Sequence, residues 1–319
     1  MLDGSKLARS DLIQAAALAA GGQQYPAATL YVVATPIGNL ADLTLRALHV
    51  LALVDAIACE DTRHSAALLR HFGIDKPLVA VHEHNERSAA STVLERLARG
   101  ERIAYVSDAG TPAISDPGAE LVAAARAAGY RVVPLPGASS ALAALCAAGD
   151  TASTGFAFVG FLAARGAERA RRLGELSRHA STQVVFEAPH RIDALARELA
   201  AACPDRIATI CRELTKQFET IATMPSRELP TWLDAESNRS RGEFVLVLHA
   251  LPAAVSESAG GDHDALLAPL LAALPLKQAV SLAAEIGGAP RNLLYARALE
   301  LKREPPDADS DADADADAN

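Results

Sequence analysis

Leu30–Asn39 reads LYVVATPIGN and joins a short apolar run to a loop that contains proline and glycine. The run Leu30–Ala34 has the length of a buried strand and is too short for a helix. Pro36 and Gly38 then favour a turn. Leucines at helical spacing follow between residues 42 and 54. This stretch therefore predicts a unit of strand, loop and helix.

The same unit recurs along the first half of the chain. Apolar runs at 56–59, 78–81, 102–106 and 131–135 are each followed by a polar or glycine- and proline-rich segment, and then by helical spacing. Strands that alternate with helices form a mostly parallel sheet that helices cover. We expect an N-terminal α/β domain over residues 29–149.

The order of elements changes after a break at residues 149–155. Further strands are expected at 156–159, 183–186, 206–211, 218–222 and 244–248, with helices at 165–179 and 192–202. The later strands are closely spaced without helices between them, which predicts a mixed, partly antiparallel sheet. The expected fold class is α/β, with a second α/β domain over residues 150–250 and a small helical unit over 264–302.

Both ends of the chain lack the pattern of a packed domain. Residues 1–28 show no sustained periodicity and are expected to form a disordered extension. The Asp-Ala alternation within residues 303–319 cannot bury a core and predicts a disordered acidic tail. Without the seven acidic residues from Glu304 onward, 30 cations face 32 anions, so the net charge changes from −9 to −2. The near-neutral remainder leaves room for a local basic patch and a nucleic-acid partner.

Several classes of protein do not fit the sequence. No run reaches the ~18 consecutive apolar residues of a membrane helix. Asp3 and Asp11 stand where a signal peptide carries positive charge. The four cysteines form no CxxC pair, and no Cys/His cluster has the spacing of a zinc site. We therefore expect a cytoplasmic protein that uses neither a membrane nor a metal.

The ends of the first five expected strands are rich in residues that bind ligands. They read TPIGN, EDTRH, HEHNE, SDAGTP and PGASS, and in an open parallel sheet ligands bind at these carboxyl ends. The phosphate-binding patterns GxGxxG and GxxxxGK are missing, which favours a cofactor without phosphate. Gly110, Pro112 and Gly137 would let the backbone approach a flat adenosine. Asp108 is a candidate to bind an ammonium or a ribose hydroxyl.

Ten motifs in one order resemble the ribosomal RNA small subunit methyltransferase I family, which belongs to the tetrapyrrole-methylase superfamily. The resemblance covers roughly residues 29–302. The motifs are LYVVATPIGNLADLTLRAL from Leu30, ACEDTRHSAALLRHFGI from Ala58, HEHNE from His82, YVSDAGTPAISDPG from Tyr105, VVPLPGASSALAAL from Val132, GFL from Gly160, FEAPHR from Phe186, RELTKQFET from Arg212, RGEFVLVL from Arg241 and LPLKQAVSLAAEIGGAPRNLLYARAL from Leu274.

The resemblance implies S-adenosylmethionine as cofactor, bound in a cleft between two α/β domains. It implies methyl transfer to a cytidine ribose 2′-oxygen in the decoding region of 16S rRNA, by a homodimer that binds this RNA or the small ribosomal subunit. The cofactor residues that it implies are Pro36, Ser107, Asp108, Ala109, Gly110, Thr111, Pro112, Gly137, Ala138, Ser139, Gly160, Phe161 and Leu162.

One segment departs from that family. After GFL the family continues with proline and a lysine-rich stretch, whereas this chain has Ala163–Gly166. The arginines that follow are candidates to supply the same positive charge; they are Arg165, Arg169, Arg171 and Arg172.

Glu60, Asp61 and Arg63 are the candidate catalytic residues. A ribose hydroxyl is weakly acidic, so a base that takes its proton, or a cation that lowers its pKa, would assist the transfer. Glu60 and Asp61 are both possible bases, and the choice between them stays open. The alternative is structural, since Asp61 or Thr62 would also cap the N-terminus of the next helix and Arg63 would be solvated.

Candidate RNA contacts are spread over the whole chain. They are His82, His84 and Asn85 after the third strand, His190 and Arg191 after a second-domain strand, Arg212 and Lys216 in a charged connection, and Lys277 and Arg291 in the helical unit. Arginine and lysine bind phosphate, and an aromatic side chain such as Tyr295 can stack on a base. Each of these residues also has a purely structural interpretation, as a histidine at a strand edge, as the start of a helix or as a solvated surface residue.

Two other functions compete with RNA methylation. The first is a tetrapyrrole C-methyltransferase with the same fold and cofactor. Against it, TPIGN lacks the glycine-rich GxGxGD-like loop of the superfamily's tetrapyrrole enzymes, and a terminal helical unit favours RNA. The second is a ribosome-assembly module that keeps the fold without catalysis, which turnover of labelled cofactor would distinguish.

Overall fold

The computed structural model describes residues 9–82, 85–251 and 263–302. The chain divides into a larger unit that ends at Leu251 and a smaller one that begins at Pro252. Among the described residues, no helix has both the length and the apolar character to cross a membrane.

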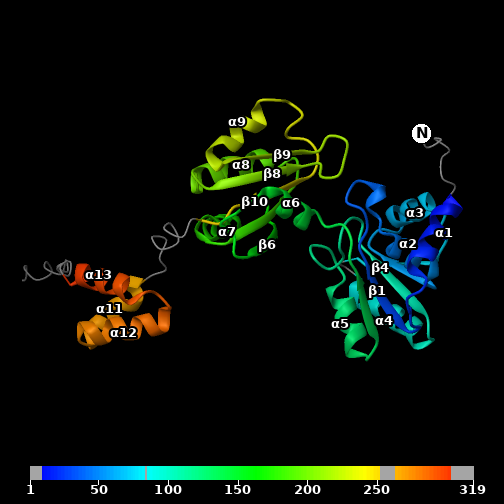
Figure 1. Ribbon diagram of the computed structural model, residues 1–319, viewed down its shortest axis with the longest axis horizontal. Coiled ribbons are helices and arrows are strands. Elements are labelled where there is room, and N and C mark those ends of the chain that lie inside the picture. The colour runs from blue at the N-terminus through cyan, green and yellow to red at the C-terminus, as the bar shows by residue number, and fades with distance from the viewer. Residues whose placement is uncertain (1–8, 83–84, 252–262, 303–319) are drawn as a thin grey trace, which may run out of the picture. The chain divides into compact units, whose positions relative to one another are not determined.

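The first sheet of the larger unit is entirely parallel, as predicted (Figure 1). Its strands lie in the order β3-β2-β4-β1-β5. Their bounds are β1 (Thr29–Val33), β2 (Ala56–Cys59), β3 (Leu78–Ala80), β4 (Arg102–Val106) and β5 (Arg131–Leu135). The chain order reverses around β1 and β4, which lie side by side. This is the switch point at which parallel sheets bind their ligands.

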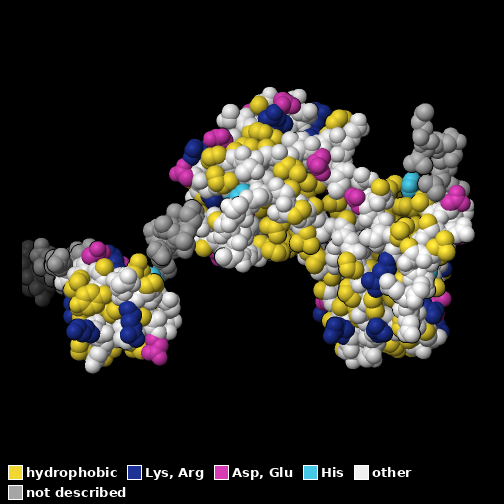
Figure 2. Space-filling model, viewed as in Figure 1, with side chains coloured by type: hydrophobic (Ala, Val, Ile, Leu, Met, Phe, Trp, Pro, Cys, Tyr) yellow, Lys and Arg dark blue, Asp and Glu magenta, His cyan; other side chains and the backbone are white. Residues whose placement is uncertain are grey.

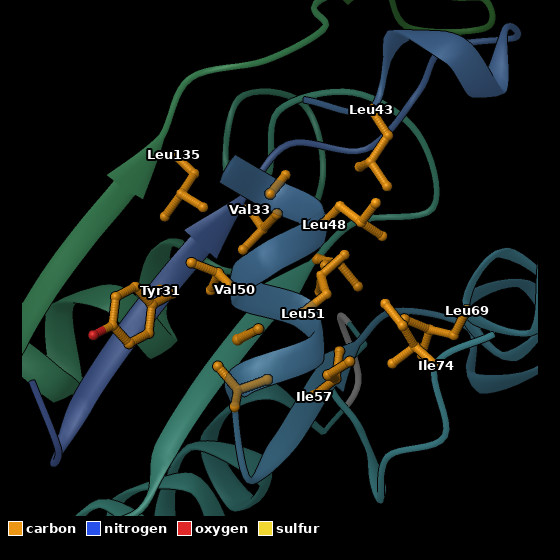
Figure 3. Close-up of a cluster of buried hydrophobic side chains, with 14 of the residues drawn as sticks. Tyr31, Val33, Leu43, Leu48, Val50, Leu51, Ile57, Leu69, Ile74 and Leu135 are labelled. Atoms are coloured by element: carbon orange, nitrogen blue, oxygen red, sulfur yellow. The ribbon is translucent and has the colours of Figure 1, made fainter. Parts of the chain in front are cut away.

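Helices cover both faces of this sheet (Figure 1). One face carries α1 (Arg9–Ala20), α2 (Leu45–Leu53) and α3 (Thr62–His71), and the other carries α4 (Glu86–Ala98) and α5 (Ala119–Ala127). Successive strand residues point to opposite faces. Tyr31 and Val33 therefore pack with Leu48 and Leu51 of α2 (Figure 3), while Leu30 packs in the core under α4 and α5.

The prediction of a disordered extension over residues 1–28 is wrong for residues 9–28. Helix α1 packs against α2, and Ala16 is fully buried in the same core as Leu51. Leu12 and Ile13 pack partly buried against that core. The helix escaped detection because alanines occupy both of its faces, so apolar periodicity is weak although one face is buried. Residues 1–8 lie outside the described part of the chain.

The second sheet is mixed, as predicted, in the order β6-β7-β10-β8-β9. Only β6 and β7 pair in parallel; the other three pairs are antiparallel. The strands are β6 (Phe156–Phe161), β7 (Thr182–Glu187), β8 (Ile207–Arg212), β9 (Thr220–Pro225) and β10 (Phe244–Leu248). One face packs against α7 (Ala167–Arg178), α8 (Ile192–Ala202) and α9 (Leu229–Asp234). Short 3₁₀ turns lie at η1 (Leu40–Asp42) and η2 (Ser226–Glu228).

Helix α6 (Ser140–Ala148) covers the other face of the second sheet. Its residues Ala144 and Ala148 are buried with Val184, Cys211 and Val247. The expected boundary at residues 149–150 assigned α6 to the first domain. By packing, α6 belongs to the second core, because its small alanine face fits closely against the strands.

Over its described residues, 263–302, the smaller unit forms three helices: α11 (His263–Ala273), α12 (Leu276–Gly287) and α13 (Arg291–Leu301). They share a core of their own that includes Leu267, Val280 and Leu294. Arg297 of α13 forms an ion pair with Asp264 of α11 at 2.5 Å. The predicted helical unit over residues 264–302 thus matches these three helices.

Candidate functional site

Three loops that follow strands of the first sheet are bonded to one another. The backbone of Thr35, after β1, exchanges two hydrogen bonds with Gly110, after β4, at 2.9 and 3.0 Å. The Thr35 hydroxyl also donates to the Ser107 carbonyl at 3.2 Å. The Thr111 hydroxyl donates to the Ala138 carbonyl, after β5, at 3.0 Å. These contacts fix the loops after β1, β4 and β5 as one surface.

Two glycines allow this close approach. A Cβ on Gly137 would lie 2.8 Å from the Cβ of Ala34, closer than two such atoms normally come. Gly110 has φ of 86°, a conformation that side chains other than glycine rarely adopt. Both glycines thus allow the loops to pack closely on one another, and their expected role in the approach to an adenosine stays a prediction.

A first cavity of about 370 Å³ is lined by these loops and by the edge of the second sheet. Its lining is mostly apolar with a few polar groups, as in small-molecule sites. From the first half of the chain come Ile37, Ala109, Gly110, Thr111, Ile114, Ser115, Asp116, Ser139, Ser140 and Ala141. From the second half come Phe161, Phe186, Glu187, Ala188, Pro189, Leu214, Glu243, Phe244 and Val245.

The predicted cofactor residues fall into three groups. Ala109, Gly110, Thr111, Ser139 and Phe161 line the first cavity. Pro36 and Asp108 line a second cavity described below. The others lie beneath or beside the loops; of these Ser107, Pro112, Gly160 and Leu162 are buried, Ala138 accepts the Thr111 bond and Gly137 packs on Ala34.

Sequence reasoning missed part of the first cavity. Phe244 and Val245 carry no chemical signature, and only their strand is predictable. Asp116 had a usable signal, since it is the second aspartate of SDAGTPAISDP in the same strand-end loop. Phe186 and Ala188 belong to FEAPHR, one of the motifs that carry the family resemblance.

Three carboxylates, Glu60, Asp108 and Asp116, lie around the loop after β4. Burial raises the pKa of Asp116, and the charge of Asp108 raises it further. Burial also raises the pKa of Glu60, with contributions from Asp116 and Asp108. Because like charges raise each other's pKa, a positively charged ligand would be stabilised here.

Asp61 and Arg63 adopt the structural alternative. Asp61 is the N-cap of α3, and its Oδ1 accepts the Arg63 backbone N–H at 2.8 Å. The Arg63 side chain adds an ion pair at 3.0 Å and is 91% exposed. These bonds lower the pKa of Asp61 to about 2, which leaves it a poor base. The expectation of Asp61 as a base is therefore corrected, and Glu60 stays a candidate.

A second cavity of about 460 Å³ adjoins the first. Helix α3 contributes His64, Ala67, Leu68 and His71 to it. The loops after β1 and β4 contribute Pro36, Ile37, Gly38, Leu40, Asp108 and Ala109, and the second half of the chain contributes Lys216 and Glu243. The two cavities share Ile37, Ala109 and Glu243.

Lys216 lies at the wall of the second cavity. Its Nζ donates to Glu213 Oε1 at 2.9 Å and to Glu243 Oε2 at 3.0 Å. Partial burial alone would lower the pKa of Lys216, but the hydrogen bonds to Glu213 and Glu243 raise it above the ordinary value. Its stem crosses Gly38, where a Cβ would come within 2.5 Å of Lys216 Cγ. Two carboxylates thus fix the position of the Lys216 ammonium group.

Two arginines expected to bind RNA are used inside the fold. Arg191 donates to the Leu162 carbonyl at 2.6 Å and pairs with the buried Glu187 at 2.6 Å. Arg212 donates to the carbonyls of Arg241 and Phe218 at 2.6 and 3.2 Å. These geometries correct both assignments, because the sequence does not reveal buried acceptors.

Arg169 is likewise part of the fold. It was a candidate for basic charge after GFL, yet it is buried and bonds to Glu198 at 3.0 Å, with Glu187 3.5 Å away. Arg171 and Arg172 are exposed and pair with acidic residues of their own helix. Arg165 is exposed.

The other RNA candidates lie mainly at the surface. His82 and His190 are exposed, as are Lys277 and Arg291 of the helical unit. Figure 2 shows lysine and arginine side chains beside hydrophobic ones on that unit. Asn85 closes the turn before α4, since its Oδ1 accepts the His82 N–H at 2.8 Å. His84 lies outside the described residues.

Comparison with known proteins finds relatives over most of the chain. The family model of the tetrapyrrole (corrin/porphyrin) methylases matches residues 29–230, and that of the RsmI C-terminal HTH domain matches residues 257–302. Ribosomal RNA small subunit methyltransferase I of Pseudomonas aeruginosa is 50% identical over 276 residues, which is 86% of this chain and 98% of that relative. The protein of the same name from Escherichia coli O157:H7 is 48% identical over 272 residues, 85% of this chain and 94% of that relative.

Solved structures share the fold at low identity. A cobalt precorrin-4 methyltransferase has a TM-score of 0.52 at 18% identity, over 69% of this chain and 94% of its own. A diphthine synthase has a TM-score of 0.54 at 14% identity, over 72% of this chain and 94% of its own. The motifs, the two sheets and these relatives together show that the chain belongs to the tetrapyrrole (corrin/porphyrin) methylases and, within them, to the ribosomal RNA small subunit methyltransferase I family.

Proposed function

We propose that this protein transfers a methyl group from S-adenosylmethionine to the ribose 2′-oxygen of a cytidine in the decoding region of 16S rRNA. The observation that carries the proposal is the 50% identity to a ribosomal RNA small subunit methyltransferase I over 98% of that relative. Similarity of this extent includes both α/β sheets and the helical unit.

The first cavity has the chemistry that S-adenosylmethionine requires. Phe161 and Phe186 offer aromatic surface to an adenine, and the backbone at Ala109–Thr111 offers N–H and C=O groups to its polar edges. Asp116 in the lining favours a positive charge. When bound, the cofactor supplies a methyl group on a positively charged sulfur.

The protein would align the methyl donor with the ribose hydroxyl and would remove the proton of that hydroxyl. The three bonded loops and the second sheet would hold a ligand of the first cavity in a fixed orientation, and alignment of donor and acceptor is a large part of the rate in such transfers. Glu60 has a raised pKa, which brings it nearer to the range of an effective base. We assign the proton acceptor to Glu60 in preference to Asp61.

The division of labour follows the domain organisation. We propose that the two α/β sheets and the helices that cover them bind the cofactor and target nucleotide, and that the unit over 264–302 adds RNA affinity through Lys277 and Arg291. His82, His84 and His190 are proposed RNA contacts. The protein acts on the small subunit in the cytoplasm, as a homodimer.

Methyl transfer from labelled cofactor tests this function. Small ribosomal subunits from cells that lack the enzyme are expected to accept label, and a tetrapyrrole such as uroporphyrinogen is expected to accept none. Label on the tetrapyrrole alone would favour the C-methyltransferase. Cofactor binding by folded protein without transfer to either acceptor would favour the assembly module.

A further inference from the structure

We propose that the second cavity is the binding site of the target nucleotide, with His64 and His71 of α3 and with Lys216 as its polar contacts. This inference rests on the proposed function, since it assigns the acceptor of the same reaction. The ligand class is a single RNA nucleotide that is unstacked from its neighbours.

The second cavity is adjacent to the first. Ile37, Ala109 and Glu243 line both cavities, so ligands in the two spaces would meet there. A methyl transfer requires the acceptor oxygen close to the donor carbon and in line with it. A volume of about 460 Å³ lies in the range of sites for small organic ligands.

The face of α3 that lines the second cavity combines polar and apolar side chains. His64, Ala67, Leu68 and His71 follow the spacing i, i+3, i+4, i+7 and therefore share one side of the helix. An apolar centre thus lies between two exposed imidazoles. Ala67 and Leu68 can pack on the flat face of a base, while the histidines can bond its edge or a phosphate. A single splayed nucleotide offers this same combination.

Lys216 is fixed beside the second cavity by two carboxylates. Lysine has three N–H donors, and within the described chain two of them bond to Glu213 and Glu243. The third is left for an oxygen atom of a ligand. Because Glu243 also lines the first cavity, Lys216 lies toward the junction, where the ribose would be.

The loop that carries Lys216 is strained. Glu213 and Thr215 have φ of 53° and 66°, and Gly242 is needed because a Cβ there would lie 2.6 Å from Glu213. Residues other than glycine rarely adopt these conformations, and backbone strain is concentrated at functional sites.

Variants of the α3 face test the assignment. His64→Ala combined with His71→Ala is expected to lower kcat/KM for under-methylated small subunits by about tenfold or more, which is the effect of losing roughly 1.4 kcal/mol of binding. The dissociation constant of S-adenosylhomocysteine, measured by titration calorimetry, is expected to stay the same. Both histidines are exposed, so the thermal unfolding temperature should not change.

Two further variants complete the design. Ala67→Trp fills the second cavity from the same helix face and is expected to abolish transfer while cofactor binding persists. Arg70→Ala is the matched control, because Arg70 is exposed on α3 and does not line either cavity. It should transfer methyl groups like the wild type.

The outcomes separate this inference from the function on which it rests. Unchanged transfer in the double variant and in Ala67→Trp would overturn the nucleotide site alone. Loss of cofactor binding in either variant would instead assign the second cavity to the cofactor and also overturn it. A wild-type protein that transfers nothing to ribosomal RNA would overturn the proposed function itself.

Discussion

At the scale of single residues, Gly137 decides how closely the loops after β1 and β5 approach. Gly137→Ala would place a Cβ 2.8 Å from Ala34 Cβ, and overpacking of this kind costs roughly 1–3 kcal/mol. We expect S-adenosylhomocysteine to bind more weakly, by about tenfold, in titration calorimetry. Gly155→Ala is the control, because a Cβ there meets no atom within 4 Å. Equal affinity in both variants would contradict the role given to the loops.

Asp116 predicts a dependence of stability on pH. Burial, and then the charge of Asp108, raise its pKa in the folded protein although Ser107 opposes this. The folded state therefore holds the proton more tightly, and stability falls as pH rises from the ordinary aspartate pKa through the raised folded value. The Asp116→Asn variant has no carboxyl group at this position and therefore does not lose stability in this way.

Urea denaturation measures this effect of Asp116. The free energy of unfolding of Asp116→Asn minus that of wild type is expected to be larger, meaning a relatively more stable variant, at about pH 7 than at about pH 3. The same difference at both pH values would show that the carboxyl group is not perturbed.

The residue scale also shows where sequence reasoning reached its limit. SDAGTP could be found because glycine and proline at a strand end mark a ligand loop. Arg191 and Arg212 were misassigned because each donates to a backbone carbonyl 29 residues away along the chain, Leu162 and Arg241 respectively. Val245 could not be predicted as a lining residue, since an aliphatic side chain is equally common in any core.

At the scale of elements, the strands of both sheets were predictable, whereas α1 and α6 were assigned wrongly and the short helix α9 was not predicted. Short apolar runs bounded by turns identify strands well, and all ten expected strands are present. Helices α1 and α6 are rich in alanine, which reveals little about the face that is buried. Their packing partners, α2 and the second sheet, are set by tertiary structure.

Helix α1 offers a direct test of this correction. Ala16→Asp would bury a carboxylate in the core that contains Leu51, so we expect a clear drop in the unfolding temperature, by roughly 2–4 °C for each 1 kcal/mol lost. Leu18→Asp on the same helix is the control, because Leu18 is 81% exposed. Similar stability of the two variants in a thermal melt would mean that α1 does not pack on α2.

At the scale of the whole molecule, the chain combines a unit that holds both cavities with a unit whose described residues form three helices. Its net charge of −9 says little about RNA, because seven of the acidic residues, Glu304 and six aspartates, lie in a tail without cations. The fold alone does not choose the acceptor either, since its structural neighbours include a precorrin methyltransferase and a diphthine synthase. The relatives are ribosomal RNA methyltransferases, and the second cavity is our proposed site for the target nucleotide.

The position of the transferred methyl group tests the central claim most directly. Small subunits from cells that lack the enzyme are incubated with the protein and labelled S-adenosylmethionine, and the modified nucleotide of 16S rRNA is mapped and identified by mass spectrometry. The account predicts one added methyl on the ribose 2′-oxygen of a cytidine in the decoding region. A methyl on a base, or on RNA outside that region, would contradict it.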